Sequence, residues 1–415
     1  MNYLEKIEHL KNLGFNGDLT QIENYYQGKS VKLDDENFAK LLDLSQKLCK
    51  EYNTILTCIP VEQDEEKKAK LNARKNELID ILFPGHGMIF NMTRGVKVVI
   101  GQVDLTGMTS VNANVHFNPY TLVHFGNYAL IGSNIVFGNI AKGQGVQQIG
   151  KITIGDDNWF CSGVKVASNV EIVDRNVFAM GAVVKQNIDS DGLFIGSPCE
   201  RKYTITHDYV SSKDSNTYRY DEEIDFIVSR LRAMGFDGDM AEYVKALRGQ
   251  DYNCLEQTMS QLHDLTHNLS YEFNNPLTTK ARKQEILDIL FPIRGKNLTI
   301  GDGLYVDLLG TTSVGNNVSI GKNAFFAGNI TIGNNTTIGN DACLSAIGHE
   351  LFYKGRHIDN IPGIISEICT IGKIKINDNL SIGNGCLFAP CCEVATDMQD
   401  GEIALPNGHI SKFEL

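Results

Sequence analysis

The chain has 415 residues with 39 glycines, 9 prolines and a formal net charge of −12. This length exceeds one ordinary domain, and the glycine content suits many tight turns better than a disordered or collagen-like chain. The negative charge disfavours nucleic acid and anionic membranes as partners, and without a membrane-length apolar run or a secretory signal we expect a cytoplasmic protein with reduced cysteines.

Residues 1–92 predict a polar, helical leader. Leu78, Ile79, Leu82 and Phe83 lie three or four positions apart, as on one face of a helix. Gly14 is placed like a glycine that ends a helix.

Residues 93–203 carry an apolar residue at every sixth position. The regular part of this series is Ile154, Phe160, Val166, Ile172, Phe178 and Val184. A helix requires a spacing of three or four and a simple strand a spacing of two, so neither explains the period. It fits a solenoid with one short strand per hexapeptide, in which one side chain points inward and a small residue follows at the corner.

The same organisation then recurs. Residues 204–220 predict a linker, 221–293 a second helical leader and 294–415 a second solenoid. Gly14-Phe15-Asn16-Gly17-Asp18 returns as Gly235-Phe236-Asp237-Gly238-Asp239, and residues 73–84 return as 281–292 with three substitutions. The second apolar series is Leu308, Val314, Ile320, Phe326, Ile332, Ile338 and Leu344, and then Ile376, Ile382, Phe388 and Val394. We therefore expect a protein dominated by β structure, with two hexapeptide solenoids that each follow a small helical leader.

The pattern resembles the maltose/galactoside O-acetyltransferase family of hexapeptide-repeat acyltransferases. The residues that carry the resemblance are the leader motif at 281–291, the repeats, and Ile195-Gly196-Ser197-Pro198. The resemblance implies left-handed parallel β-helices with three hexapeptides per turn. It also implies acetyl-CoA as co-substrate, a sugar or glycan hydroxyl as acceptor, and a homo-oligomer, with a trimer favoured.

By this resemblance His349 is the general base, because it lies in the loop that follows the corner at Leu344. A histidine suits proton transfer from a hydroxyl because its pKa lies near neutrality. Glu350 replaces the usual proline, which departs from the family pattern. Asn329 matches an asparagine that orients the reacting groups, although asparagine also commonly fills hexapeptide turns.

The two halves differ in what they retain. The first lacks most of the loop that carries His349 and has Lys142 in its place, whereas it has Trp159 where the second has Ser381. By resemblance, the side chains that line the cofactor groove or meet its phosphates are Trp159, Lys185, Arg201 and Lys202. Because the site of that family lies between two solenoids, we expect one composite site, in which His349 faces a groove completed by the first half of the same chain or of a neighbouring chain.

Three further assignments depend on position alone. Ser162 and Gly163, or Gly385 in the other half, are candidates for backbone donors to an oxyanion. Asp35 and Asp251 lie near the acidic position that contacts acceptor sugar in the family, and both also suit a helix N-cap or first turn.

Two other functions remain open. A zinc carbonic anhydrase requires three histidines around one metal, and His349, His357 and His409 do not supply an evident set, so we expect no metal. A catalytically inactive scaffold or binding partner is the alternative from another class, because loss of a loop in one half is what relaxed selection on catalysis would leave.

Overall fold

The structure is a computed structural model that describes residues 1–87, 90–105, 107–139, 145–203, 221–254, 256–349, 368–371, 373–389, 392–405 and 410–412. For 91, 202–203, 347–349, 368–371 and 410–412 it describes the backbone alone. The chain divides into two compact units, Met1–Ile205 (unit 1) and Thr206–Glu414 (unit 2). The predicted linker at 204–220 lies outside the described residues.

The leader of unit 1 is helical, as the sequence predicts. Its elements are α1 (Tyr3–Asn12), α2 (Thr20–Tyr26), β1 (Val31–Lys32), α3 (Glu36–Cys58), a 3-10 turn (Ile59–Val61) and α4 (Glu65–Leu82). Asn2 and Glu5 form a capping box at the start of α1, which satisfies backbone donors that the helix leaves unpaired. Gly14, at φ +88°, follows the C-cap of α1 and has the left-handed conformation that is common just after a helix C-terminus. Of the four residues predicted to share a helical face, Leu78 and Leu82 are buried in α4, Ile79 is half-buried, and Phe83 is buried at the C-cap just beyond the helix.

The coil of unit 1 consists of three parallel sheets. Their strand orders are β13-β10-β6-β3, β16-β14-β11-β7-β4-β2 and β15-β12-β8-β5. The strands are β2 (Phe90–Met92), β3 (Val103–Leu105), β4 (Thr109–Val111), β5 (His116–Phe117), β6 (Thr121–Phe125), β7 (Ala129–Ile131), β8 (Val136–Phe137), β10 (Gly150–Ile154), β11 (Trp159–Phe160), β12 (Lys165–Val166), β13 (Val170–Ile172), β14 (Asn176–Phe178), β15 (Val183–Val184) and β16 (Gly192–Ile195). β17 (Glu200–Tyr203) joins β16 in antiparallel fashion, and β9 (Val146–Gln147) pairs with β1.

Unit 2 has a leader of the same kind. It comprises α5 (Asp221–Ala233), α6 (Ala241–Leu247), β18 (Tyr252–Asn253), α7 (Gln257–Asn274) and α8 (Lys280–Leu290). Glu256 and Thr279 cap α7 and α8 by accepting backbone N–H groups of their first turns. Gly235, at φ +86°, follows α5 as Gly14 follows α1.

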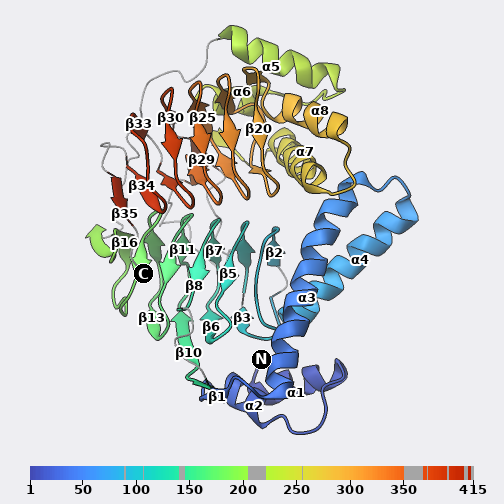
Figure 1. The fold of residues 1–415 in the computed structure, drawn as a ribbon, viewed down its shortest axis with the longest axis vertical. Coiled ribbons are helices and arrows are strands. Elements are labelled where there is room, and N and C mark those ends of the chain that lie inside the picture. The colour runs from blue at the N-terminus through green and yellow to red at the C-terminus, as the bar shows by residue number, and fades with distance from the viewer. Residues whose placement is uncertain are drawn as a thin grey trace, which may run out of the picture. The chain divides into compact units, whose positions relative to one another are not determined.

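The coil of unit 2 also has three parallel sheets, ordered β19-β22-β25-β30-β33, β20-β23-β26-β31 and β21-β24-β27-β32-β34. The strands are β19 (Ile293–Arg294), β20 (Thr299–Ile300), β21 (Tyr305–Val306), β22 (Thr312–Val314), β23 (Ser319–Ile320), β24 (Phe325–Ala327), β25 (Asn329–Ile332), β26 (Thr337–Ile338), β27 (Cys343–Ser345), β30 (Lys373–Ile376), β31 (Ser381–Ile382), β32 (Leu387–Phe388), β33 (Glu393–Val394) and β34 (Glu402–Ala404). β35 (Ile410–Lys412) adds to β34 in antiparallel fashion. Figure 1 shows the short strands of each unit stacked in parallel rows.

The hexapeptide period follows from the geometry of one turn. Asn317 Nδ2 donates to Asn335 Oδ1 at 2.9 Å across 18 residues, which is three hexapeptides. Both asparagines have positive φ, +56° and +53°, a conformation that asparagine tolerates better than most residues. A Cβ at Gly339 would lie 2.6 Å from the backbone nitrogen of Asn384, so the small residue after each inward position leaves room for the next turn. Parallel sheets around a shared interior agree with the expected β-helix, and its left-handed winding remains a prediction.

The predicted inward residues form the cores of the coils. Every member of the two regular series is buried, with exposed fractions of 4% or less. In unit 1 phenylalanines form a continuous column, in which Phe160 stacks on Phe178 at 4.9 Å between ring centroids. One expectation is corrected: Leu308 is buried in a turn, and Val306 is the residue that pairs with Phe326 in the ladder.

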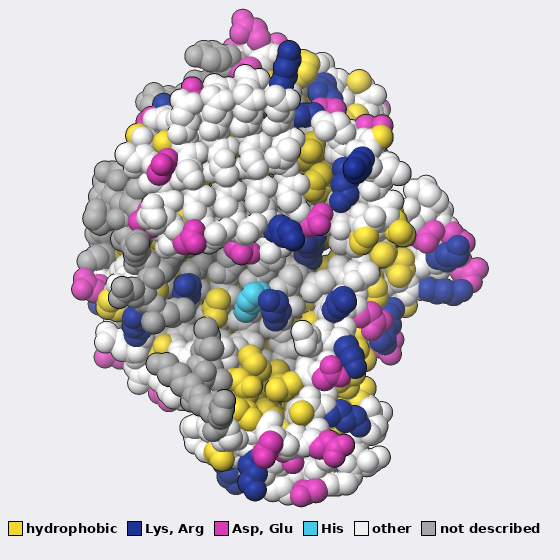
Figure 2. Space-filling model, in the orientation of Figure 1, with side chains coloured by type: hydrophobic (Ala, Val, Ile, Leu, Met, Phe, Trp, Pro, Cys, Tyr) yellow, Lys and Arg dark blue, Asp and Glu magenta, His cyan; other side chains and the backbone are white. Residues whose placement is uncertain are grey.

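The surface of unit 2 is polar over its strands. Figure 2 shows a broad area there with few charged or hydrophobic side chains. The outward residues of the β20-β23-β26-β31 sheet are all exposed hydroxyl residues, namely Thr299, Ser319, Thr337 and Ser381. Within the described part of the chain, none of the helices is both long and apolar enough to cross a membrane.

Candidate functional site

His349 lies on an excursion that leaves the coil of unit 2. The chain departs after Ser345 in β27 and forms β28 (Ile347–His349), which pairs with β29 (Ile368–Ile371). His349 is opposite Cys369, and β29 in turn pairs with β18 of the leader. The backbone of His349 is therefore fixed between the coil and the leader, while its side chain and residues 350–367, which include Glu350, lie outside the described residues.

Asn329 begins β25 and is 4% exposed. Its Nδ2 donates to the carbonyl oxygen of Ala246 at 3.0 Å. Ala246 lies in the last turn of α6, where backbone carbonyls have no partner within the helix. The amide of Asn329 thus attaches the leader to the coil, and only its Oδ1 has no protein partner. This contact supports a structural role for Asn329.

Trp159 lies in β11 on the outer face of its sheet, since Phe160 beside it points into the core. Its neighbours in register are Leu130 and Val177. The three side chains form an apolar row across adjacent turns of unit 1. Ser381, at the corresponding place in unit 2, is exposed.

The corner after β11 uses its polar groups for contacts between turns. The N–H of Gly163 donates to Ser133 O at 2.8 Å, and the hydroxyl of Ser162 accepts from Ser133 N at 3.3 Å. The N–H of Gly385 likewise donates to Asn340 O at 2.7 Å. The N–H groups of both glycines are therefore engaged within the coil, so neither can stabilise an oxyanion without breaking that bond.

The basic residues near the end of unit 1 lie close to an acid. The Nε of Arg201 donates to Asp191 O at 2.7 Å, and its Nη2 lies 3.2 Å from Asp191 Oδ1. Arg175, which sequence reasoning missed, lies 3.7 Å from the other oxygen of the same carboxylate. Two guanidinium groups thus contact one carboxylate beside the last turn. Lys185 is exposed just beyond β15, and the side chain of Lys202 lies outside the described residues.

The two leader acids have different environments. Asp35 caps α3, because its Oδ1 accepts the backbone N–H of Phe38 at 2.8 Å. In the alignment that pairs Gly14 with Gly235, its counterpart is Glu256, which caps α7. Asp251 is exposed just before β18. The structure therefore does not place Asp35 and Asp251 at equivalent positions.

One cluster of potential ligands escaped the sequence analysis. His263, His267 and Asp307 have metal-ligating atoms that all lie within 4.8 Å of one another. The available signal was the spacing of four between two histidines in a predicted helix, which puts them on one face. Lys142, His357 and His409, which entered the earlier hypotheses, lie outside the described residues.

Comparison with known proteins finds hexapeptide repeats in unit 2. Residues 311–346 match the family described as bacterial transferase hexapeptide (six repeats). The Saccharomyces cerevisiae protein named "Putative acetyltransferase YJL218W" is 35% identical to this chain over 77 residues. That match covers 19% of this chain and 37% of the yeast protein, so well under half of the relative's length is matched.

Solved structures with similar folds include two acetyltransferases. A hexapeptide-repeat acetyltransferase of Vibrio cholerae, complexed with acetyl-CoA, is 21% identical with a TM-score of 0.36, and the match covers 45% of this chain and 98% of that one. A maltose O-acetyltransferase of Clostridium difficile is 20% identical with a TM-score of 0.32, and the match covers 45% of this chain and 97% of that one. At these scores the likeness carries no argument about the activity of this chain.

Proposed function

We propose that the chain is an acetyl-CoA-dependent O-acetyltransferase that modifies a hydroxyl of a sugar or glycan, with His349 as general base. The observation that carries the proposal is the position of His349 at the end of β28, on the excursion that directly follows the hexapeptide repeats at 311–346. The acceptor class and the co-substrate follow the family resemblance of the sequence.

The chemistry assigned to His349 is proton transfer. Its imidazole would accept the proton of the acceptor hydroxyl as that oxygen attacks the thioester carbonyl. The same proton would return to the sulfur when the carbon–sulfur bond breaks, so the products are the acetyl ester and free CoA. General base catalysis of this kind contributes about 10²- to 10⁴-fold to a rate.

The cofactor-binding residues remain part of the proposal. Trp159 offers a partly exposed aromatic surface, and Lys185 with the Arg175–Asp191–Arg201 group offers positive charge for phosphates. Lys202 stays a sequence-based prediction. For Asn329, Asp35 and Gly163 the contacts that the structure describes favour a role in the fold.

The test is release of free CoA from acetyl-CoA, followed with a thiol reagent against a panel that begins with maltose and galactosides. We expect turnover by the full chain and a loss of at least about 100-fold in kcat for His349→Asn. His124→Gln is the matched control, because His124 lies in a regular strand of unit 1. Equal activity of the wild type and His349→Asn would refute the assignment of the base.

The alternative is a catalytically inactive scaffold. It is favoured by the use of Asn329 Nδ2 and the Gly163 N–H in contacts that hold the fold. An inactive scaffold would release no CoA with any acceptor. The wild type, His349→Asn and His124→Gln would then not differ in CoA release.

A further inference from the structure

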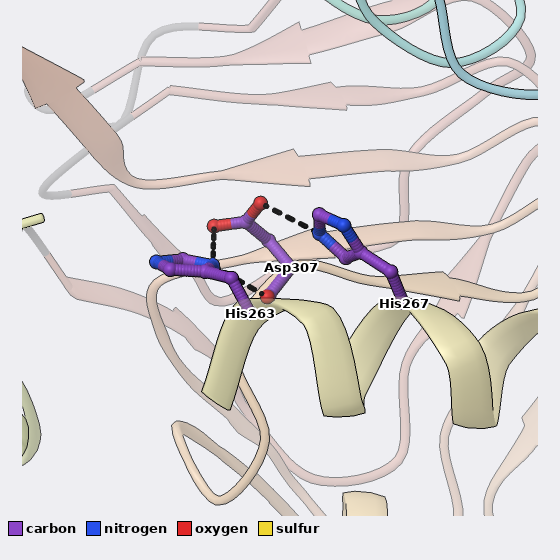
Figure 3. Close-up of side chains that lie close together, drawn as sticks. All are labelled: His263, His267 and Asp307. Carbon is purple, nitrogen blue, oxygen red and sulfur yellow. Dashed lines mark hydrogen bonds and ion pairs between the residues drawn. The ribbon is translucent and has the colours of Figure 1, made fainter. Parts of the chain in front are cut away.

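Two histidines of the unit 2 leader face the first turn of its coil. His263 and His267 lie four residues apart in α7, so their side chains are neighbours on one side of the helix. Asp307 follows β21 directly and presents its carboxylate between them (Figure 3). The three groups thus come from α7 of the leader and from the first turn of the coil, which contact each other.

The distances are those of a loose set of ligands. Asp307 Oδ2 lies 3.8 Å from His263 Nδ1, and Oδ1 lies 3.6 Å from His267 Nε2. Both exceed the usual length of a hydrogen bond. Ligands about 2.0–2.1 Å from a tetrahedral zinc ion lie roughly 3.4 Å from one another. The largest separation here is 4.8 Å, so side-chain movements of about 1.5 Å would close the set around an ion.

The local hydrogen bonds keep the imidazoles near this geometry. His263 Nδ1 donates to the carbonyl oxygen of Asp307 at 3.0 Å, so a metal at Nδ1 would have to displace this proton and replace this hydrogen bond. His267 Nε2 lies 2.9 Å from the hydroxyl of Tyr305, whose ring stacks on Phe325.

The site is shielded but reachable. The side chains of His263, His267 and Asp307 are 19%, 26% and 20% exposed. Two nitrogens and one carboxylate oxygen suit zinc and its neighbours in the transition series, whereas magnesium and calcium prefer oxygen ligands. Three protein ligands leave one coordination position for water.

Unit 1 has the same framework without these ligands. Ser45 Oγ accepts from Ile100 N at 3.1 Å, as Thr266 Oγ1 accepts from Leu309 N at 3.2 Å. In that alignment the residues in place of His263, His267 and Asp307 are Leu42, Gln46 and Val98. Since the scaffold forms in unit 1 with these residues, it does not require the two histidines and the aspartate.

We propose that His263, His267 and Asp307 bind one divalent transition-metal ion of the zinc class, which clamps α7 to the first turn of the unit 2 coil. This site differs from the metal-free chain that the sequence analysis expects. It does not depend on the proposed acyltransferase activity.

The experiment uses the full chain, stripped with a chelator, and titrates it with Zn²⁺ by calorimetry and with Co²⁺ by visible absorption. We expect one equivalent of Zn²⁺ that depends on the three residues, the absorption of a tetrahedral Co²⁺ complex, and a rise in Tm on adding Zn²⁺. His263→Leu and His267→Gln introduce the unit 1 residues, and Asp307→Asn preserves shape. Each should weaken Zn²⁺ binding at least tenfold and leave the Tm of the metal-free chain within a few degrees.

The matched control is His86→Gln. His86 Nε2 lies 2.9 Å from Asp80 Oδ1 in unit 1, a histidine–carboxylate pair outside any set of three ligands among the described residues. The chain also has ten cysteines, whose thiolates can bind Zn²⁺ elsewhere. The Zn²⁺ bound at this site is therefore the difference in Zn²⁺ stoichiometry between the wild type and Asp307→Asn. No such difference, an equal loss in His86→Gln, or a preference for Mg²⁺ would overturn the proposal. If a histidine variant does not fold, Asp307→Asn alone decides.

Discussion

Units 1 and 2 hold their leaders onto their coils with closely matching contacts. The hydroxyl of Tyr26 donates to Ile100 O at 2.7 Å in unit 1, and that of Tyr243 donates to Leu309 O at 2.9 Å in unit 2. Gly101 N and Gly310 N donate to the last residues of α4 and α8, each at 3.1 Å. These contacts end on backbone atoms, which every sequence provides.

The same correspondence joins the long helices of each leader. Arg74 contacts Glu51 through two nitrogens at 2.7 and 3.1 Å, and Arg282 contacts Glu272 at 2.6 and 2.9 Å. The two units differ instead in individual side chains and in one excursion from the coil. Among the described residues, the excursion with His349 and the histidine–aspartate cluster belong to unit 2, whereas Trp159 and the paired arginines belong to unit 1. The comparison indicates that the scaffold is retained in both units while the residues capable of chemistry have diverged.

The largest effect on stability should come from a partly buried ion pair of unit 1, for which the aligned residues of unit 2 carry no charge. Lys6, with a side chain 5% exposed, lies 2.9 Å from Asp104, and the corresponding residues of unit 2 are Ile227 and Ser313. Asp104→Asn leaves the ammonium without its carboxylate and should cost unit 1 about 2 to 3 kcal/mol of unfolding free energy, measured by chemical denaturation. The double change Lys6→Ile with Asp104→Ser should restore stability to within about 1 kcal/mol. If the double variant is as unstable as Asp104→Asn, the two units do not use equivalent frameworks here.

The inward residues of the coils could be predicted from the sequence because they recur at a fixed interval of six residues. Phe160, Ile332 and Leu344 are buried where the six-residue period places them. It failed at Leu308, because two extra residues in the first turn of unit 2 shift the ladder to Val306, and such a shift leaves the period of later turns unchanged.

The site was less accessible to the sequence than the fold. The sequence predicts that His349 lies outside the coil, because the hexapeptide series is interrupted there by a long loop. The hydrogen bond from Asn329 to Ala246, in contrast, joins residues 83 positions apart, and no local sequence pattern predicts it. The cluster of His263, His267 and Asp307 required knowledge of which face of α7 meets β21. Pairings of this kind depend on tertiary packing.

Next in size is an effect on cofactor affinity. If Trp159 contacts acetyl-CoA, Trp159→Ala should raise the KM for acetyl-CoA about tenfold, which corresponds to roughly 1.4 kcal/mol. Ser381→Ala, at the corresponding place in unit 2, should leave KM unchanged. Identical KM values for Trp159→Ala and wild type would remove Trp159 from the cofactor site.

The smallest effects should be equal in the two units. Arg74→Ala and Arg282→Ala each remove a paired guanidinium from a partly exposed site, and each should cost about 1 kcal/mol by chemical denaturation. The hydrogen bond from Arg74 lowers the pKa of Glu51, so the stabilisation from this pair is present above the ordinary glutamate pKa and is lost as the pH falls through the lowered value. The stability difference between wild type and Arg74→Ala should therefore shrink in acid. A difference that grows in acid would contradict the assigned pairing.

The most direct test of the proposed activity identifies the product rather than the leaving group. The full chain is incubated with acetyl-CoA and the preferred sugar, and the sugar is examined by mass spectrometry with wild type, His349→Asn and His124→Gln. The account predicts one added acetyl ester with wild type and His124→Gln, and almost none with His349→Asn. Acetylated sugar at the wild-type rate from His349→Asn, or none from any form of the protein, would contradict it.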